Sequence, residues 1–289
     1  MNKNNFSFYA KKGVRIYYYL QIPQDARGIV LISHGYGEHF GLYEEFMEFL
    51  TRNGYGVCAY DHRAHGRSEE ERGHIERFEL LIDDMAEVVN NLKREYPELH
   101  LFTFGHSMGG LIAFTYGILH PEDIHGQIFT GPAVGRPWGT SIIPSGLFRL
   151  FKRYFARVRI YPILARKGSR NMPFRAKLKD DPYRLRYVTV GFVYEFIYRG
   201  IAWAKDNASS YHLPVLFMHG KSDKIIPYLA SVEIFEEISS EDKLLKLYEN
   251  LYHELVREPE RETVWQDILE WLERRMDQAP ILLRGTTDE

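Results

Sequence analysis

The sequence predicts an α/β fold: a mostly parallel central sheet, helices on both of its faces, and an inserted, largely helical cap. Over most of the 289 residues, apolar runs of strand length alternate with amphipathic helical segments. This alternation is typical of parallel sheets. It stops after residue 132 and resumes at residue 209. We therefore expect a core formed by residues 1–132 and 209–289, with residues 133–208 inserted as the cap.

The strands expected before the cap are short runs rich in apolar, β-branched and aromatic residues. They cover residues 14–22, 28–33, 57–60, 99–104 and 124–130. The run at 28–33 is almost entirely apolar, as expected for a parallel strand that is buried on both faces. Apolar side chains at helical spacing predict the helices between these strands, at residues 42–53, 79–96 and 111–119.

The same alternation continues after the cap. Strands are expected at residues 215–218 and 244–248, and helices at 228–238 and 257–276. Because the links are short, we expect consecutive strands to run parallel, with each intervening helix packed on a face of the sheet.

The cap segment has an uneven charge distribution. Residues 136–179 contain twelve Lys and Arg residues and no Asp or Glu, so the rest of the chain carries −14 within a total of −2. Aromatic residues are interleaved with these charges: Trp138, Phe148, Phe151, Tyr154, Phe155, Tyr161 and Phe174. Insertions in such folds lie over the ligand crevice at the carboxyl ends of the strands. We expect this one to cover an apolar channel, with a basic face that either docks on anionic lipid or only offsets the acidic core.

Composition excludes several classes of protein. Hydrophobic residues make up 45% and charged residues 26%, which excludes a disordered or fibrous chain. The single cysteine, Cys58, excludes a disulfide framework and a thiolate metal cluster. No targeting segment and no apolar run of bilayer length is visible. We expect a cytoplasmic protein, with peripheral contact to a membrane left open and no prediction of its oligomeric state.

A nucleophile motif lies between a predicted strand and a predicted helix. Residues 105–110 read Gly-His-Ser-Met-Gly-Gly, which matches G-x-S-x-G in the strand–turn–helix context that this motif requires. Such a turn exposes the hydroxyl of Ser107 at the carboxyl edge of the sheet. The alternative is a glycine-rich turn with an idle serine.

A serine nucleophile needs a base that is held by a third group. In doubly wound hydrolases the chain order is serine, acid, histidine. Asp223 follows the predicted strand at 215–218, and His253 is the only histidine beyond it. Asp206 and Asp242 are alternative acids, although neither directly follows a strand.

The tetrahedral oxyanion that forms when such a serine attacks needs hydrogen-bond donors. The strand at 28–33 leads into His-Gly-Tyr-Gly-Glu-His, and we expect the backbone N–H groups of Tyr36 and Met108 to supply them. Gly35, Glu38 and His106 are expected to line the substrate site or support its reactive groups. Whether Glu38 or Arg63 braces the loop is left open.

A group of histidines near two strand ends raises a metal alternative. It consists of His34, His39, His62 and His65, together with Asp61. Both loops are glycine-rich strand exits that the fold already explains, so we expect structural hydrogen bonds, with no metal and no cofactor. Cys58 lies in an apolar strand and is expected to be an inert buried thiol.

The chain carries H-G-Y-G-E-H at 34–39, Y-D-H-R-A-H-G-R-S at 60–68, G-H-S-M-G-G at 105–110, G-K-S-D-K-I-I-P at 220–227 and a final His253. Over about residues 10–275, apart from the cap, this set resembles the monoacylglycerol lipases and related lysophospholipases of the α/β-hydrolase fold. The resemblance implies a Ser107–Asp223–His253 triad and oxyanion donors at Tyr36 and Met108. Two positions depart from the family pattern: Tyr36, where alanine is usual, and Ala64, where glycine is more frequent.

The resemblance implies a serine hydrolase that cleaves single-chain lipid esters, with monoacylglycerol as the first expectation. A lysophospholipase or a general carboxylesterase is the alternative, because the cap sets substrate choice and matches no member closely. A non-catalytic protein that binds a hydrophobic ligand is a more remote alternative. A nucleic-acid partner is not expected, because the chain outside the cap is acidic and carries no binding motif.

Overall fold

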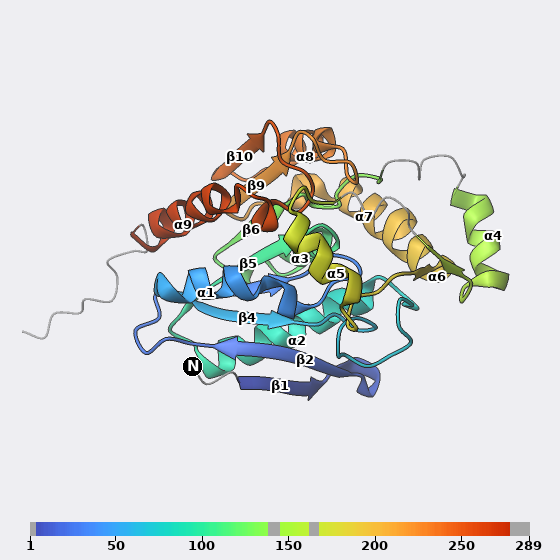
Figure 1. Cartoon of the computed structure of the whole chain (residues 1–289), viewed down its shortest axis with the longest axis horizontal. Helices are drawn as coiled ribbons and strands as arrows, with labels where there is room; N and C mark the ends of the chain where they lie inside the picture. The colour runs from blue at the N-terminus through green and yellow to red at the C-terminus, as the bar shows by residue number, and fades with distance from the viewer. Residues whose placement is uncertain (1–3, 138–144, 162–167, 278–289) are drawn as a thin grey trace, which may run out of the picture.

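An eight-stranded sheet forms the centre of the fold, with the strand order β1-β2-β4-β3-β5-β6-β9-β10 (Figure 1). The computed structural model describes residues 4–137, 145–161 and 168–277. The six strands from β4 to β10 pair in parallel, and β2 is antiparallel to both of its neighbours. The mostly parallel sheet predicted from the sequence is therefore confirmed. The strands are β1 (Asn4–Tyr9), β2 (Arg15–Gln21), β3 (Gly28–Ser33), β4 (Gly56–Tyr60), β5 (His100–His106), β6 (Gly126–Thr130), β9 (Val215–Gly220) and β10 (Lys243–Tyr248).

Helices cover both faces of the sheet, and strand β3 contributes to both apolar layers. Ile29 and Leu31 belong to the layer that contains α2, α3 and α8, whereas Val30 and Ile32 belong to the layer that contains α1 and α9. Successive side chains of a strand point to opposite faces, so one fully buried strand serves both layers. The helices are α1 (Glu44–Arg52), α2 (Glu79–Glu95), α3 (Met108–Leu119), α8 (Tyr228–Glu237) and α9 (Arg261–Asp277).

Two helices begin later than the sequence predicts. Helix α1 follows a 3₁₀ turn, Phe40–Tyr43, and α9 follows another, Leu255–Arg257. Glu258 is extended, at φ −66° and ψ 164°, because the residue before a proline disfavours the helical region. Short 3₁₀ turns also occur at Lys11–Gly13, Pro121–Asp123 and Ala208–Ser210.

Strand β1 is not predicted from the sequence. It begins with two asparagines and forms the edge of the sheet, where it pairs with β2. Its aromatic residues supply the contact: the rings of Phe6 and Phe8 lie 5.4 and 5.9 Å from the ring of Tyr18. Aromatic cross-strand pairs of this kind stabilise an edge strand whose pattern is otherwise polar.

The described residues between β6 and β9 are largely helical, as predicted, and Figure 1 places α4 at the end of the molecule opposite α9. The division into core and cap at residues 133 and 208 stays a prediction, and Trp138, Arg166 and Lys167 of the predicted cap lie outside the described residues. None of the described helices combines the length and apolar character needed to cross a bilayer. The cap elements are α4 (Ser145–Phe155), β7 (Arg159–Ile160), α5 (Met172–Asp180), β8 (Val188–Thr189), α6 (Val190–Val193), a π-helix (Tyr194–Gly200) and α7 (Ile201–Asp206).

Candidate active site

Ser107 occupies a strained turn between β5 and α3. Its backbone has φ 52° and ψ −115°, a conformation that non-glycine residues rarely adopt. A Cβ at Gly105 would lie 2.7 Å from the carbonyl oxygen of Gly109, and a Cβ at Gly109 would overlap the carbonyl oxygen of Ser33. The two glycines of the motif are therefore required by the close approach of backbone segments around Ser107.

The structure brings Ser107, His253 and Asp223 together from three distant parts of the chain. Nε2 of His253 lies 2.8 Å from Oγ of Ser107, and Nδ1 of His253 lies 2.6 Å from Oδ2 of Asp223. Of the two alternative acids, Asp242 pairs instead with Arg275, and Asp206 lies at the end of α7. This geometry allows a proton to pass from the serine hydroxyl to the imidazole while the carboxylate fixes the ring.

Further hydrogen bonds fix the Asp223 carboxylate. Its Oδ1 accepts the backbone N–H groups of Ile225 and Ile226 at 2.7 and 3.0 Å, and its Oδ2 lies 3.0 Å from Nε2 of His219. These contacts hold the carboxylate in place and favour its ionised form.

Asp223 and His253 each favour the charged form of the other. Burial alone would raise the pKa of Asp223, but the neighbouring His253 and the hydrogen bond from His219 hold that pKa well below its usual range. Burial alone would lower the pKa of His253, but the charge and hydrogen bond of Asp223 raise it above 6.5. The imidazolium that forms when His253 accepts a proton is thus stabilised by a carboxylate that stays ionised.

Of the two expected oxyanion donors, Met108 directly follows Ser107, and Tyr36 lines the same cavity as Ser107. Within the described residues, the backbone N–H groups of Tyr36 and Met108 donate to no other protein group, so both are available to a substrate oxygen. The Tyr36 hydroxyl donates to the carbonyl oxygen of Tyr187 in the cap, and its ring lies 5.2 Å from that of Phe192. The large side chain at this position therefore attaches the loop to the cap.

Glu38 braces the oxyanion loop from inside the protein. One carboxylate oxygen accepts the Gly35 N–H at 2.9 Å and the Tyr43 hydroxyl at 2.7 Å, and the other accepts from Arg257. A Cβ at Gly35 would lie 2.9 Å from the His106 ring. The loop is thus held against the β5 strand end.

Arg63 does not brace the oxyanion loop. Its buried guanidinium instead binds Asp84, with Nε 2.6 Å and Nη2 2.5 Å from the carboxylate oxygens, and it also contacts Glu70. This bidentate pair connects the loop after β4 to helix α2. The question left open by the sequence is answered in favour of Glu38.

Arg257 is a site residue that is not predicted from the sequence. It is 6% exposed and donates to both Glu38 and Glu254, the residue that follows His253. Its guanidinium also lies over the rings of Tyr43 and Phe174, at 4.5 and 4.9 Å from their centroids. The only sequence signal is that Glu254 and Arg257 follow the final histidine by one and four positions. This spacing is not specific for any site.

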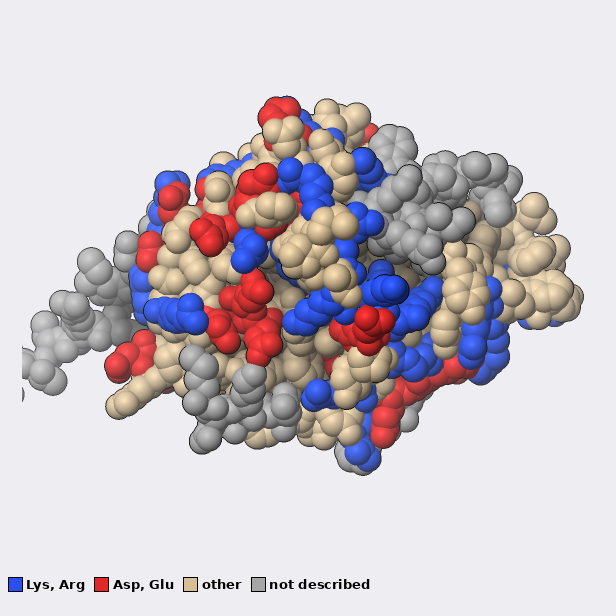
Figure 2. Space-filling model, viewed as in Figure 1, with Lys and Arg blue, Asp and Glu red and all other residues tan. Residues whose placement is uncertain are grey.

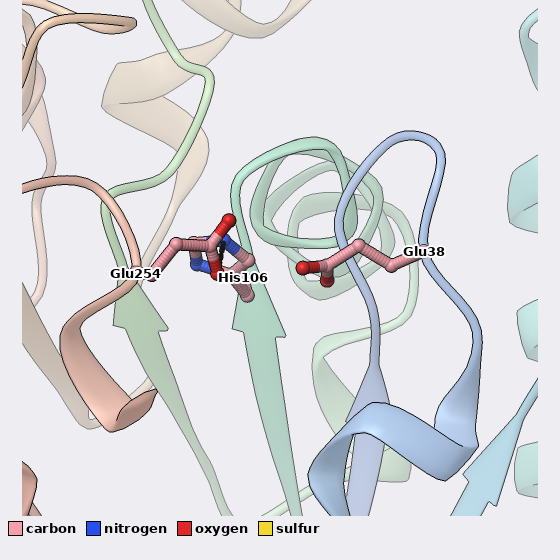
Figure 3. Close-up of side chains that lie close together, drawn as sticks. All are labelled: Glu38, His106 and Glu254. Carbon is pink, nitrogen blue, oxygen red and sulfur yellow. Dashed lines mark ion pairs between the residues drawn. The ribbon is translucent and has the colours of Figure 1, made fainter. Parts of the chain in front are cut away.

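His106 completes this buried polar cluster (Figure 3). Its Nε2 lies 3.4 Å from Glu254, and its Nδ1 lies 2.9 Å from the carbonyl oxygen of Thr130. Potential metal-ligand atoms of Glu38, His106 and Glu254 lie within 4.8 Å of one another. Arg257 already binds both carboxylates, and its charge holds the pKa of Glu254 well below the usual range although burial alone would raise it. A guanidinium therefore supplies the positive charge that this cluster needs.

The histidines that raised the metal alternative support the loops through hydrogen bonds. The backbone N–H of His62 donates to Nε2 of His34 at 3.1 Å, and His65 contacts the carbonyl oxygen of Arg63 at 3.0 Å. Burial lowers the pKa of His62 to about 3 and that of His65 to about 4, so both rings are neutral near pH 7. His39 lies instead 2.8 Å from Asp181 of the cap.

Two other buried polar groups behave as expected from the sequence. Asp61 accepts the backbone N–H groups of Phe40 and Arg67, both at 2.8 Å, and so supports the two loops. Cys58 is fully buried, and burial raises the pKa of its thiol. A thiol in this state is a poor nucleophile.

A cavity of about 1000 Å³ opens between the core and the cap, and Ser107 and His253 lie on its wall. Gly35, Tyr36, Glu38 and His106 also line it, as expected. The cap side chains on this wall include apolar and basic ones. The apolar ones are Met172, Phe174, Leu178 and Leu185, and the basic ones are Arg175, Lys179, Arg184 and Arg186.

Comparison with known proteins places the chain among serine hydrolases. The family model described as "Serine aminopeptidase, S33" matches residues 24–260. The chain is 32% identical over 272 residues to a monoacylglycerol lipase of Mycolicibacterium smegmatis, covering 93% of this chain and 97% of that protein. It is 30% identical over 254 residues to the monoglyceride lipase of Rattus norvegicus, covering 86% and 84%.

Solved structures agree with these matches. The monoacylglycerol lipase of Paleococcus ferrophilus superposes with a TM-score of 0.82 at 29% identity, covering 90% of this chain and 99% of that one. A soluble variant of the Saccharomyces cerevisiae monoglyceride lipase, in complex with a substrate analogue, gives 0.83 at 27% identity and 95% coverage of both chains.

Proposed function

The chain belongs to the serine aminopeptidase S33 family of α/β-hydrolases, and from this premise we propose that it hydrolyses the ester bond of monoacylglycerols to release a fatty acid and glycerol. One observation carries the proposal. Ser107 Oγ lies 2.8 Å from His253 on the wall of a large cavity that the cap lines partly with apolar side chains. Such a cavity has the size and character of a site for a small lipid. The relatives named as monoacylglycerol and monoglyceride lipases support the same substrate.

The reaction follows from the geometry. Oγ of Ser107 attacks the ester carbonyl carbon while Nε2 of His253 takes the hydroxyl proton. The negative charge on the carbonyl oxygen is held by the N–H groups of Tyr36 and Met108. When the bond to the glycerol oxygen breaks, His253 returns the proton to that oxygen. A water molecule, deprotonated by the same histidine, then attacks the acyl carbon. The bond to Oγ of Ser107 breaks, the fatty acid leaves and His253 returns the proton to Oγ. Asp223 stabilises the imidazolium in both steps.

Contact with a lipid surface forms the second part of the proposal. Helix α4 exposes large apolar side chains, among them Leu147 at 57%, Leu150 at 55% and Phe151 at 53%. The same helix carries the exposed Arg149 and Arg153. A helix with an exposed apolar face and flanking cations is suited to peripheral contact with a membrane that contains anionic lipid. The cytoplasmic location expected from the sequence stays a prediction.

Fatty-acid release from a monoacylglycerol tests the ester hydrolase. The wild type should release fatty acid rapidly, and Ser107→Ala should reduce the rate to the uncatalysed background. A fluorophosphonate probe should label the wild type and not the variant. If the wild type neither turned over the ester nor reacted with the probe, the remote alternative of a non-catalytic binding protein would replace this proposal.

Vesicle binding tests the membrane contact separately. Binding should increase with the fraction of anionic lipid and decrease with added salt. Leu150→Ser combined with Phe151→Ser should weaken binding, while hydrolysis of a water-soluble short-chain ester stays unchanged. Equal binding of the wild type to neutral and anionic vesicles would exclude the role of the basic residues.

A further inference from the structure

Four basic side chains of the cap line the cavity on one side. Arg175 and Lys179 lie one helical turn apart on α5, so they share a face of that helix. Arg184 and Arg186 follow in the segment that leads to β8. The space-filling view shows Lys and Arg side chains bordering the hollow beside α5 (Figure 2). A positive charge of this kind is not needed to bind glycerol or an acyl chain.

These four cations differ in their partners from four other basic residues of the cap. Arg157, Lys152, Arg170 and Arg199 each form an ion pair with a glutamate. Among the described residues, no carboxylate pairs with any of the four cavity cations.

The hydrogen bonds of the four side chains leave most of their donors available. Arg186 donates to the carbonyl oxygen of Lys179 at 2.6 Å, and Arg175 contacts only the sulfur of Met172 at 3.6 Å. The side chains of Lys179 and Arg184 have no hydrogen-bond partner within the described part of the chain. Their donors therefore face the cavity without a protein acceptor.

The two acidic groups on the cavity wall are bound by a cation outside the cavity. Glu38 and Glu254 line the cavity, but both bind Arg257 behind it. Asp181, at the end of α5, pairs with His39. The unpaired positive charge of the cap side is therefore available to a ligand.

We propose that Arg175, Lys179, Arg184 and Arg186 form an anion-binding subsite that holds the phosphate group of a single-chain lipid ester whose carbonyl lies at Ser107. Guanidinium groups bind phosphate oxygens in bidentate geometry, and lysine adds a point charge. The inference rests on the proposed ester hydrolase and extends its substrates from neutral monoacylglycerols to acyl esters with a phosphorylated head group.

Binding is the first test, because it does not depend on turnover. The probes are 1-O-decyl glycerol and 1-O-decyl glycerol 3-phosphate, ethers that Ser107 cannot cleave, titrated calorimetrically into the wild type. The phosphate ether should bind at least tenfold more tightly, and added salt should reduce this difference. Lys179→Gln combined with Arg184→Gln should remove roughly tenfold or more of the preference, with the affinity for the neutral ether unchanged.

A matched control lies on the same helix. Lys177 does not line the cavity, so Lys177→Gln should keep the wild-type preference. Thermal unfolding of each variant establishes that it is folded. Equal affinity for the two ethers, or an equal loss in Lys177→Gln and in the double variant, would overturn the subsite.

Two further measurements distinguish which ligand the cations bind and whether the enzyme hydrolyses esters. Inorganic phosphate and decanoate, titrated alone, should each bind far more weakly than the phosphate ether; a comparable affinity for decanoate would assign the cations to the fatty-acid product instead.

Hydrolysis of the acyl glycerol and acyl glycerol phosphate is then compared with the Ser107→Ala blank. Loss of both hydrolyses with an intact preference for the phosphate ether would reject the ester hydrolase and keep the subsite. Hydrolysis without that preference would do the reverse.

Discussion

Nε2 of His39 lies 2.8 Å from Oδ2 of Asp181, which joins the loop after β3 to the end of helix α5 in the cap. Two other hydrogen bonds connect the same segments. The Leu185 N–H donates to the carbonyl oxygen of Gly37 at 2.9 Å, and the Tyr36 hydroxyl donates to the carbonyl oxygen of Tyr187. The loop that supplies one proposed oxyanion donor is therefore held in place by the segment that covers the substrate.

Asp181→Ala should lower the free energy of unfolding by about 1 kcal/mol at pH 7, because it removes a charge-assisted hydrogen bond that is largely shielded from water. Burial alone would raise the pKa of Asp181, but the hydrogen bond from His39 lowers it overall. A lowered pKa stabilises the fold above the ordinary carboxylate pKa, and this stabilisation is lost as pH falls through the folded value. Urea unfolding at pH 7 and below pH 4 should show the difference between wild type and variant shrinking at low pH. Asp180→Ala, at an exposed neighbouring residue, is the control. An equal loss of unfolding free energy in that variant would contradict a stabilising role for the hydrogen bond between His39 and Asp181.

The pH profile of kcat/KM should rise through a step with a midpoint above 6.5, because His253 must be neutral to accept the serine proton and its pKa is raised. Burial lowers that pKa, while the charges of Asp223, Glu254 and Glu38 raise it. Glu254→Gln should therefore move the midpoint to lower pH. Initial rates on a soluble ester across pH 5 to 9 measure the shift, with the exposed Glu262→Gln as the comparison. A midpoint that stays in place in Glu254→Gln would show that this carboxylate does not act on the base.

Arg257→Met should be among the most destabilising substitutions in the chain. It leaves the carboxylates of Glu38 and Glu254 buried without their cation, and removing one partner of a buried ion pair costs about 3–5 kcal/mol. Denaturant unfolding gives the loss. Arg261→Met, which breaks a pair with the largely exposed Glu45, should cost less than about 1 kcal/mol. Similar losses for the two arginines would mean that the Arg257 network is not stabilising.

A second readout separates positioning by Arg257 from stability alone. At a temperature where Arg257→Met is fully folded, kcat on a soluble ester should fall, because Glu38 no longer holds the Gly35 N–H in the loop beside Ser107. Arg257→Lys should restore part of the stability, since an ammonium replaces the charge but cannot reach both carboxylates with the same geometry. Unchanged kcat in folded Arg257→Met would limit this residue to a structural role.

The site residues that could be predicted from the sequence are those that belong to a recognisable local sequence pattern. The turn around Ser107 needs glycines on both sides. Asp223 and His253 each follow a predicted strand, and the carboxyl ends of parallel strands meet at one edge of the sheet. Buried strands such as β3 are predicted for the same reason, because burial on both faces requires a continuous apolar run.

What could not be predicted depends on contacts between distant segments. Arg257 and Glu38 are 219 positions apart, and nothing in either neighbourhood indicates their ion pair. The reason for a large side chain at Tyr36 is visible only where its hydroxyl contacts the carbonyl oxygen of Tyr187 in the cap. Strand β1 is polar at its start, and its extended conformation depends on pairing with β2. Each of these features is fixed by tertiary packing rather than by local propensity.

Gly109→Ala should abolish activity and destabilise the fold, whereas Gly146→Ala should do neither. The new Cβ at position 109 would overlap the backbone carbonyl of Ser33, and neither segment can give way without moving Ser107 or the end of β3. A Cβ at position 146, in helix α4, meets no atom within 4 Å, so alanine should be neutral or stabilise the helix by up to about 1 kcal/mol. Ester hydrolysis and thermal unfolding of the two variants form a matched pair. If Gly109→Ala kept wild-type turnover, the tight packing of the nucleophile turn against β3 would not be what positions Ser107.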